Sequence, residues 1–232
     1  MITEDMQTRD RILATSFSLF LERGYENTPV QAIIDAVGIA KGTFYHHFKG
    51  KEEMLVDLIQ GMSRRVVDVI APIVDDPALD AREKMLAFSQ AALTQKAADS
   101  GPETVLLVRQ MRSKANRLLA DSINEIASQW ILPLYTRVIR QGVDEGLFRV
   151  ADPALASELA FGAILSMKDR IADLFIDLER RDPRTLDRLM EVYRAIEQAI
   201  ERILGAPEGS LPIYTSLDIR GYLTPLFPGG NS

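Results

Sequence analysis

The sequence predicts an all-α protein of about nine helices, with a small N-terminal three-helix head and a larger helical body. Three observations favour this fold class. Apolar residues recur at helical spacing through nearly every segment. No segment shows the sustained alternation of apolar and polar residues that is typical of a half-buried strand. Glycine, proline and aspartate residues separate the periodic segments, where helices are expected to begin and end.

The first helix is predicted at residues 8–23. One apolar face follows the i, i+4, i+7, i+8 spacing of a buried helical stripe. Gly24 is expected to end this helix, and Tyr25 to pack back against it. The residues of the predicted face are Leu13, Phe17, Phe20 and Leu21.

Two short helices are predicted next, at 30–36 and 40–48, with a turn at Gly38 between them. Thr28 is expected to cap the first of them, with Pro29 at its first position. The second helix divides into an apolar inner face and a polar outer face, and Gly42 allows a close approach of its backbone to a ligand. The inner residues are Ile39, Phe44 and Phe48, and the outer ones are Lys41, Thr43, Tyr45, His46 and His47. Two such helices after a packing helix are typical of a DNA-binding helix-turn-helix.

The body is predicted to be helical throughout. Its helices are expected at 51–71, 80–99, 102–113, 115–145, 152–180 and 183–204, and Pro133 is expected to kink or split the fourth of these. The predicted domains are therefore 1–50, a helix-turn-helix head, and 51–204, an effector-binding and dimerisation domain. The tail, 205–232, is rich in proline and glycine but too apolar for a solvated linker, so we expect it to dock. Its apolar residues are Leu211, Ile213, Tyr214, Leu217, Ile219, Tyr222, Leu223, Leu226 and Phe227.

Composition excludes several classes of function. The chain of 232 residues has no cysteine, which removes disulfides, thiol nucleophiles and thiolate metal sites. Its two histidines, His46 and His47, are adjacent and cannot form the i, i+4 pair of zinc hydrolases. We therefore expect no enzyme, no cofactor and no metal. Without an apolar run long enough to span a bilayer, and with a polar start, the chain is expected to be cytoplasmic, with no signal peptide and no membrane partner.

The charge distribution favours specific over general DNA binding. The net charge is −6, which argues against a protein that coats nucleic acid. Between Ala36 and Lys51, however, there is no acidic residue, and Lys41 and Lys49 lie within that stretch. A weakly basic tip on an acidic body suppresses non-specific binding more than specific binding.

Residues 28–55, TPVQAIIDAVGIAKGTFYHHFKGKEEML, resemble the signature of the TetR (tetracycline-repressor-like) family of transcriptional regulators. The resemblance implies a one-component regulator that binds operator DNA. It implies a capping and phosphate-binding Thr28, base contacts from Lys41, Gly42, Thr43 and His46, and phosphate contacts from Tyr45, His47 and Lys51. Two positions depart from the family pattern: Ala40 replaces the usual capping serine or threonine, and Ile34 replaces a small residue.

A single head makes too few contacts for high affinity, so a dimer on a palindromic operator is expected. The last predicted helix carries an apolar stripe at spacings of three and four, and the helix before it offers small residues for close approach. The proposed interface comprises Leu186, Leu189, Tyr193, Ile196, Ile200 and Ile203, with Ala160, Gly162 and Ala163. The alternative is that the stripe packs only inside its own subunit.

The middle helices are the candidate site for a small-molecule effector of unknown identity. Its predicted lining residues are Phe88, Leu106, Arg109, Met111, Trp130 and Phe161. The alternatives are that the apolar residues simply fill the core and that Arg109 is exposed or salt-bridged. An effector that swings the helix after the head would change the separation of the two recognition helices and release a repressor from DNA. The alternative function is a helical adaptor that binds protein and has lost DNA binding.

Overall fold

The computed structural model describes residues 2–98, 109–178 and 182–216. The chain forms two compact units, one of Met1–Arg64 with Arg109–Ser128, the other of Arg65–Val108 with Gln129–Ser232. The first unit is thus larger than the expected 1–50 head. It gains residues 109–128 because Leu119, fully buried, belongs to the same hydrophobic core as Phe44 and Ile59.

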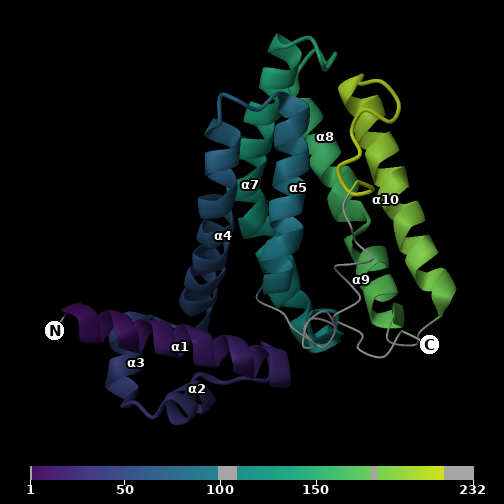
Figure 1. Ribbon diagram of the computed structural model, residues 1–232. Helices are drawn as coiled ribbons and strands as arrows, with labels where there is room; N and C mark the ends of the chain where they lie inside the picture. Colours follow the sequence, from purple (N-terminus) through teal and green to yellow (C-terminus); the bar gives the residue numbers. More distant parts are fainter. Residues whose placement is uncertain (1, 99–108, 179–181, 217–232) are drawn as a thin grey trace. The chain divides into compact units, whose positions relative to one another are not determined.

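The first unit contains α1 (Ile2–Arg23), α2 (Val30–Val37), α3 (Lys41–His47) and the beginning of α4 (Lys51–Asp75). A single 3-10 turn, η1 (Lys114–Asn116), and the beginning of α7 (Arg117–Asp144) complete it. In Figure 1, α2 and α3 lie together on one side of α1. The short helices and their order confirm the predicted helix-turn-helix.

The buried face of α1 differs from the predicted one. Ile12, Ser16 and Phe20 are fully buried, whereas Leu13 and Phe17 are only partly buried against the core. Ser16 is tolerated inside because its hydroxyl donates to the carbonyl of Ile12 at 2.6 Å. The predicted apolar face of α1 is therefore shifted by one position from the observed one. Helical spacing predicted the approximate side of the helix, and packing against the neighbouring helices determined which residues are fully buried.

The turns of the first unit confirm the predicted glycines. Gly24 and Gly38 have φ of +90° and +73°, the left-handed conformation that ends a helix. The ring of Tyr25 packs edge-on against Phe20, with centroids 5.0 Å apart, as the return of the chain at Gly24 requires.

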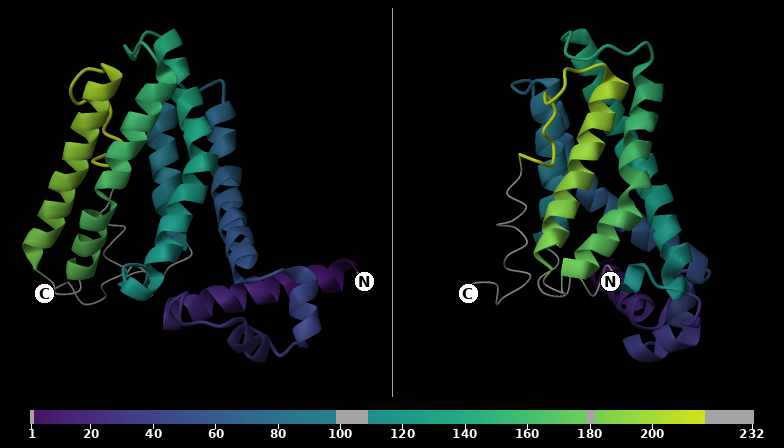
Figure 2. Two further views of the ribbon diagram at one scale, coloured as in Figure 1. Left: turned by 180° about the vertical axis from the view of Figure 1, so that it is seen from behind. Right: turned by 90° about the vertical axis from the view of Figure 1, so that its right-hand side faces the viewer.

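The second unit is built from α5 (Ala81–Ala98), α8 (Pro153–Ser166), α9 (Lys168–Asp177) and α10 (Pro183–Leu204), with the ends of α4 and α7. Helices α8 and α9 pack against α10 (Figures 1 and 2). Aspartate side chains cap three of these helices by accepting backbone N–H groups. These caps, Asp80, Asp152 and Asp182, stand where the sequence predicted helix boundaries.

Two prolines that were expected to end or break a helix lie inside continuous helices. Pro72 lies inside α4, which was predicted to end at residue 71, and Pro133 lies inside α7, which is not split. A proline removes one backbone hydrogen bond. In α4 the turn around Pro72 buries Ile70 and Val74, and in α7 the turn after Pro133 buries Tyr135, so packing offsets the loss.

The predicted helix at 152–180 is two helices. Met167 separates α8 from α9 with φ −95° and ψ −4°, and its N–H donates to the carbonyl of Ile164. The helical period continues through this residue, so the break left no mark in the apolar pattern.

The first part of the tail docks, as predicted. The segment after α10 turns back beside it (Figure 1), and Leu211, Ile213 and Tyr214 belong to the core of the second unit. Two buried carboxylates of α10 hold its backbone. Glu201 accepts the N–H of Leu211 at 2.9 Å, and Glu197 accepts the N–H groups of Tyr214 and Thr215, each at 2.7 Å. Residues Leu217, Ile219, Tyr222, Leu223, Leu226 and Phe227 lie outside the described residues.

Within the described ranges, no helix is both long and apolar enough to cross a membrane. Nor do the side chains described there bring together three metal-ligating groups of histidine, cysteine, aspartate or glutamate.

Candidate nucleic-acid interface

The recognition helix α3 is anchored by two aromatic side chains. Phe44 and Phe48 are 0% and 1% exposed, and their ring centroids lie 5.9 Å apart. The guanidinium of Arg9 on α1 lies over the Phe48 ring, 5.5 Å from its centroid, and pairs with Asp57 of α4 at 2.5 Å. Through these contacts the end of α3 is packed against α1, which is itself paired with α4.

The opposite face of α3 is open to solvent. Lys41, Gly42, Tyr45 and His46 are exposed, and Tyr45 retains 47% of its accessible surface. Thr43 and His47 are partly buried at the sides of this face. We call the six residues the α3 face; they are Lys41, Gly42, Thr43, Tyr45, His46 and His47.

The chemistry of the α3 face suits a DNA groove. The Lys41 ammonium lies 6.0 Å from the centroid of the Tyr45 ring, so a cation and a phenol stand together. A side chain at Gly42 would meet no protein atom within 4 Å, so glycine is not required there by packing inside this chain. A backbone bare of side chain at this point can approach a ligand closely.

The start of α3 carries no side-chain cap. Ala40 stands at the N-cap position with φ −70° and ψ 149°, and no side chain bonds the first N–H groups. This confirms the missing side-chain cap predicted from Ala40, although the N–H of Thr43 donates to the Ala40 carbonyl at 2.9 Å.

Two residues predicted to contact phosphates have hydrogen-bond partners inside the protein. Thr28 is 0% exposed, and its hydroxyl donates to the carbonyl of Gly24 at 2.8 Å. It does not cap α2, whose N-cap position is Pro29. The Lys51 ammonium donates to the carbonyl of Tyr25 at 2.9 Å and lies 4.2 Å from the centroid of that ring. The partner of Lys51 lies 26 positions away in the chain, which is why the sequence did not reveal it.

Tyr25 is itself kept neutral by its surroundings. Burial, and then the nearby carboxylates of Glu52 and Glu26, raise the pKa of Tyr25 to about 12. A neutral ring under the Lys51 ammonium is compatible with the cation–π contact.

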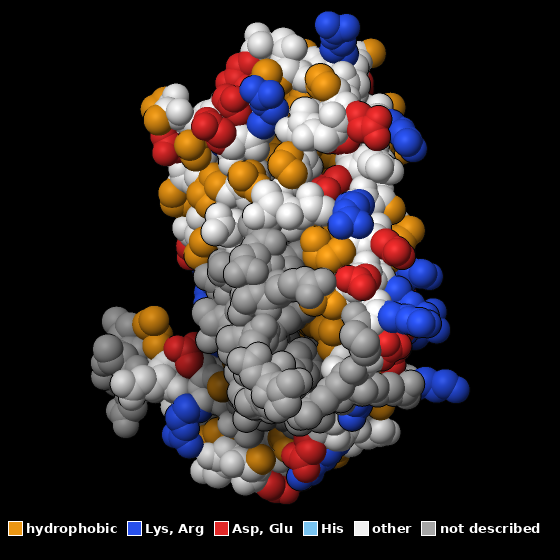
Figure 3. Space-filling view, turned by 45° about the vertical axis from the view of Figure 1, so that its right-hand side comes forward, with side chains coloured by type: hydrophobic (Ala, Val, Ile, Leu, Met, Phe, Trp, Pro, Cys, Tyr) orange, Lys and Arg blue, Asp and Glu red, His pale blue; other side chains and the backbone are white. Residues whose placement is uncertain are grey.

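Charges elsewhere are mixed. On the face that Figure 3 draws, Lys and Arg side chains lie interspersed with Asp and Glu side chains. Non-specific DNA binding needs a surface of uniformly positive charge. The mixed charges of this face do not provide such a surface, in line with the net charge of −6.

The predicted effector residues that the structure describes are divided between the two units. Phe88 and Phe161 lie on either side of Tyr135 in the second unit, with centroid distances to it of 5.8 and 6.2 Å. Trp130 is partly buried in the same unit, whereas Arg109, which is exposed, and Met111 belong to the first unit. Leu106 lies outside the described residues.

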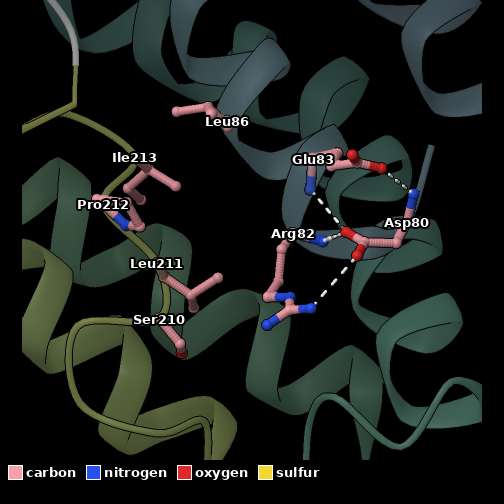
Figure 4. A pocket seen from close by; sticks show the side chains of 8 residues that line it. All are labelled: Asp80, Arg82, Glu83, Leu86, Ser210, Leu211, Pro212 and Ile213. Carbon is pink, nitrogen blue, oxygen red and sulfur yellow. Dashed lines mark hydrogen bonds and ion pairs between the residues drawn. The ribbon is translucent and has the colours of Figure 1, made fainter.

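A pocket of about 280 Å³ opens between the start of α5 and the docked tail (Figure 4). Its polar rim is already paired, because Asp80 accepts the N–H of Glu83 and faces the guanidinium of Arg82 at 3.5 Å. None of the predicted effector residues lines it. The lining residues are Asp80, Arg82, Glu83, Leu86, Ser210, Leu211, Pro212 and Ile213.

Five of the residues predicted at the dimer interface are buried within their own chain. Their side chains are between 0% and 3% exposed and belong to the core of the second unit; they are Ala160, Leu189, Tyr193, Ile196 and Ile200. Ala163, Leu186 and Ile203 are partly buried, and Gly162 is exposed. A stripe at helical spacing does not specify which neighbouring surface covers it, so the dimer interface remains a prediction.

The exposed apolar residues of α8 were missed. Leu155 and Leu159 are 54% and 55% exposed, and with Gly162 and Ser166 they follow spacings of four, three and four. We call these four residues the α8 stripe. The same spacing that singled out α10 marks them in the sequence.

Comparisons with known proteins agree with this arrangement. Residues 12–58 match the model of the family described as bacterial regulatory proteins, tetR family. The HTH-type transcriptional repressor KstR2 of Mycobacterium tuberculosis is 30% identical over 144 residues, 61% of this chain and 69% of that protein. The fatty acid metabolism regulator protein of Bacillus subtilis is 26% identical over 156 residues, 66% of this chain and 78% of that protein. The solved structure of the fatty acid degradation regulator FadR from Bacillus halodurans is 25% identical, covers 84% of this chain and 94% of its own, and has a TM-score of 0.58.

Proposed function

The chain belongs to the tetR family of bacterial regulatory proteins, and on that premise we propose that it is a repressor that binds a palindromic operator as a dimer and is released by a small molecule. The α3 face is the observation that supports DNA binding. Phe44 and Phe48 bury one side of the helix, and a cation, a phenol and a histidine stand exposed on the other. This is the arrangement that a helix needs to enter a major groove.

Four residues of the α3 face have roles that their chemistry allows. Lys41 suits the acceptor atoms of guanine, and the methyl group of Thr43 suits that of thymine. Tyr45 and His47 donate to phosphate oxygens and position the helix without reading sequence. Thr28 is fully buried with its hydroxyl bonded to Gly24, so it is left out of this interface. Lys51 is partly buried and donates to the Tyr25 carbonyl, and its ammonium has two further donors for a phosphate oxygen.

The α8 stripe supports dimerisation. Two leucines that are more than half exposed, followed by a glycine with open space around it, form a flat apolar strip to which a second copy can bind closely. Because Leu189, Tyr193, Ile196 and Ile200 are buried in the subunit core, α10 contributes its partly buried edge, Leu186 and Ile203, rather than its centre.

We infer that the effector binds around Tyr135. Its hydroxyl is buried and, among the described residues, has no hydrogen-bond partner. Phe88 and Phe161 pack on its ring, and burial raises the pKa of Tyr135 well above its ordinary value, so it stays a neutral donor. An apolar effector with one neutral oxygen acceptor would satisfy this hydroxyl, which otherwise has an unfavourable desolvation free energy.

The test is DNA binding by the full chain. A palindrome is selected from a random duplex library, and its affinity is measured for the wild type, Lys41→Ala and Lys49→Ala at several salt concentrations. Loss of a bidentate base contact predicts about a tenfold weaker binding for Lys41→Ala. Lys49, which is exposed beside the α3 face, is the matched lysine, and its substitution should change affinity much less. If the wild type selects no sequence over competitor DNA, the repressor proposal is wrong, and the alternative of a protein-binding helical adaptor is favoured.

A further inference from the structure

A segment distant in sequence is hydrogen-bonded to the turn between α1 and α2. The backbone N–H of Tyr25 donates to Oδ1 of Asn116 at 3.1 Å, and Nδ2 of Asn116 donates to the carbonyl of Gln110 at 3.0 Å. Asn116 is 0% exposed. Both the oxygen and the nitrogen of its amide are therefore hydrogen-bonded in the interior of the first unit, where an unpaired polar group would destabilise the fold.

The two backbones are also unusually close at this point. A Cβ added to Gly24 would lie 2.4 Å from Cβ of Ala115 and 3.1 Å from its carbonyl oxygen. Gly24 also has φ +90°, which other residues rarely adopt. Glycine is thus required twice over, once for the turn and once for the approach of Ala115.

Tyr25 connects this contact to the start of α4. Its N–H bonds Asn116, while its carbonyl accepts from the Lys51 ammonium at 2.9 Å. Lys51 is the first residue of α4, and only residues 48–50 join it to α3. Two hydrogen bonds, one to the N–H and one to the carbonyl of Tyr25, thus connect Asn116 with the first residue of α4, which residues 48–50 join to α3.

We propose that Asn116 is a positioning residue for DNA recognition, through which the 109–116 segment sets the orientation of α3. We call the contact the Asn116 clamp; it comprises Gly24, Tyr25, Lys51, Ala115 and Asn116. The proposal rests on the proposed function, and it identifies the route by which a change in the segment before α7 alters operator binding. Helix α7 begins in the first unit and continues as part of the second, so the clamp lies at the end of an element that belongs to both.

The experiment compares Asn116→Ala and Gly24→Ala with Asn124→Ala in the full chain. Asn124 is the matched control, because it lies on α7 in the same unit and its side chain donates to Ala120 of its own helix, at 2.7 Å. Each protein is bound to the selected palindrome and to duplexes whose half-sites are moved apart or together by one base pair. Amide hydrogen exchange of residues 41–48 is measured in the free proteins, and circular dichroism reports that each variant is folded.

The wild type should prefer the selected spacing by about tenfold, because recognition helices must match the helical repeat of DNA. Both clamp variants should reduce this preference to about threefold or less and accelerate exchange in α3, whereas Asn124→Ala should match the wild type. The proposal is overturned if Asn116→Ala lowers affinity equally at every spacing, or if exchange in α3 does not change. If the wild type binds no duplex, the proposed function fails, and the exchange result still decides whether the clamp orients α3.

Discussion

Removal of the Glu197 side chain should destabilise the second unit, because this carboxylate holds the docked tail. Glu197 is 6% exposed and accepts the N–H groups of Tyr214 and Thr215, each at 2.7 Å, and the hydroxyl of Thr215. A buried donor that loses its acceptor costs about 1–3 kcal/mol. With two backbone donors affected, Glu197→Ala should lower the free energy of unfolding by about 3 kcal/mol.

The assay is thermal unfolding of matched variants. For a protein of this size about 1 kcal/mol shifts Tm by about 2–4 °C, so Glu197→Ala should lower Tm by about 6–12 °C. Glu197→Gln retains an acceptor oxygen and should lose less than half of that. Glu191→Ala removes an exposed carboxylate from the same helix and is the control. Equal Tm values for Glu197→Ala and Glu191→Ala would refute the reasoning.

Three further outcomes are expected. Ala40→Ser supplies the cap that α3 lacks, and should raise the stability of the first unit to urea by about 1 kcal/mol; no gain would mean that the N-cap geometry at Ala40 does not admit the bond. Leu159→Arg in the α8 stripe should give monomers in analytical ultracentrifugation, while Val69→Arg, at an apolar residue of α4 that is 37% exposed, should not. Burial raises the pKa of Tyr25 and of Tyr214 to about 12, above the unfolded value near 10. The folded state therefore retains these protons, so stability is complete below pH 10 and falls as pH rises to 12. Tyr25→Phe and Tyr214→Phe should each flatten that fall in urea titrations at pH 9 and 11.5, and an unchanged slope would contradict it.

Local chemistry explains which helices could be predicted. Asp80, Asp152 and Asp182 cap the helices that follow them, and Gly24 and Gly38 end α1 and α2, because caps and left-handed glycines act within a few residues. The break at Met167 could not be predicted in the same way. No capping or breaking residue stands there, and the apolar period continues across it.

In the candidate site too, only the features that depend on nearby residues could be predicted from the sequence. The exposure of Lys41, Tyr45 and His46 and the burial of Phe44 follow from helical geometry once α3 is recognised. Lys51 could not be assigned in this way, since its partner, the carbonyl of Tyr25, lies 26 residues away in the chain.

The sequence by itself determined the all-α class, the helix-turn-helix and the polar face of its second helix, because these depend on spacing and on residues a few positions apart. Only the tertiary structure decided what covers each apolar stripe. It placed Leu189 and Ile196 in their own subunit, left Leu155 and Leu159 exposed, and brought Asn116 to Tyr25 across 91 positions of chain. The physical reason is that the hydrophobic effect is non-directional: a stripe must be buried, but nothing in its own residues specifies the surface that buries it.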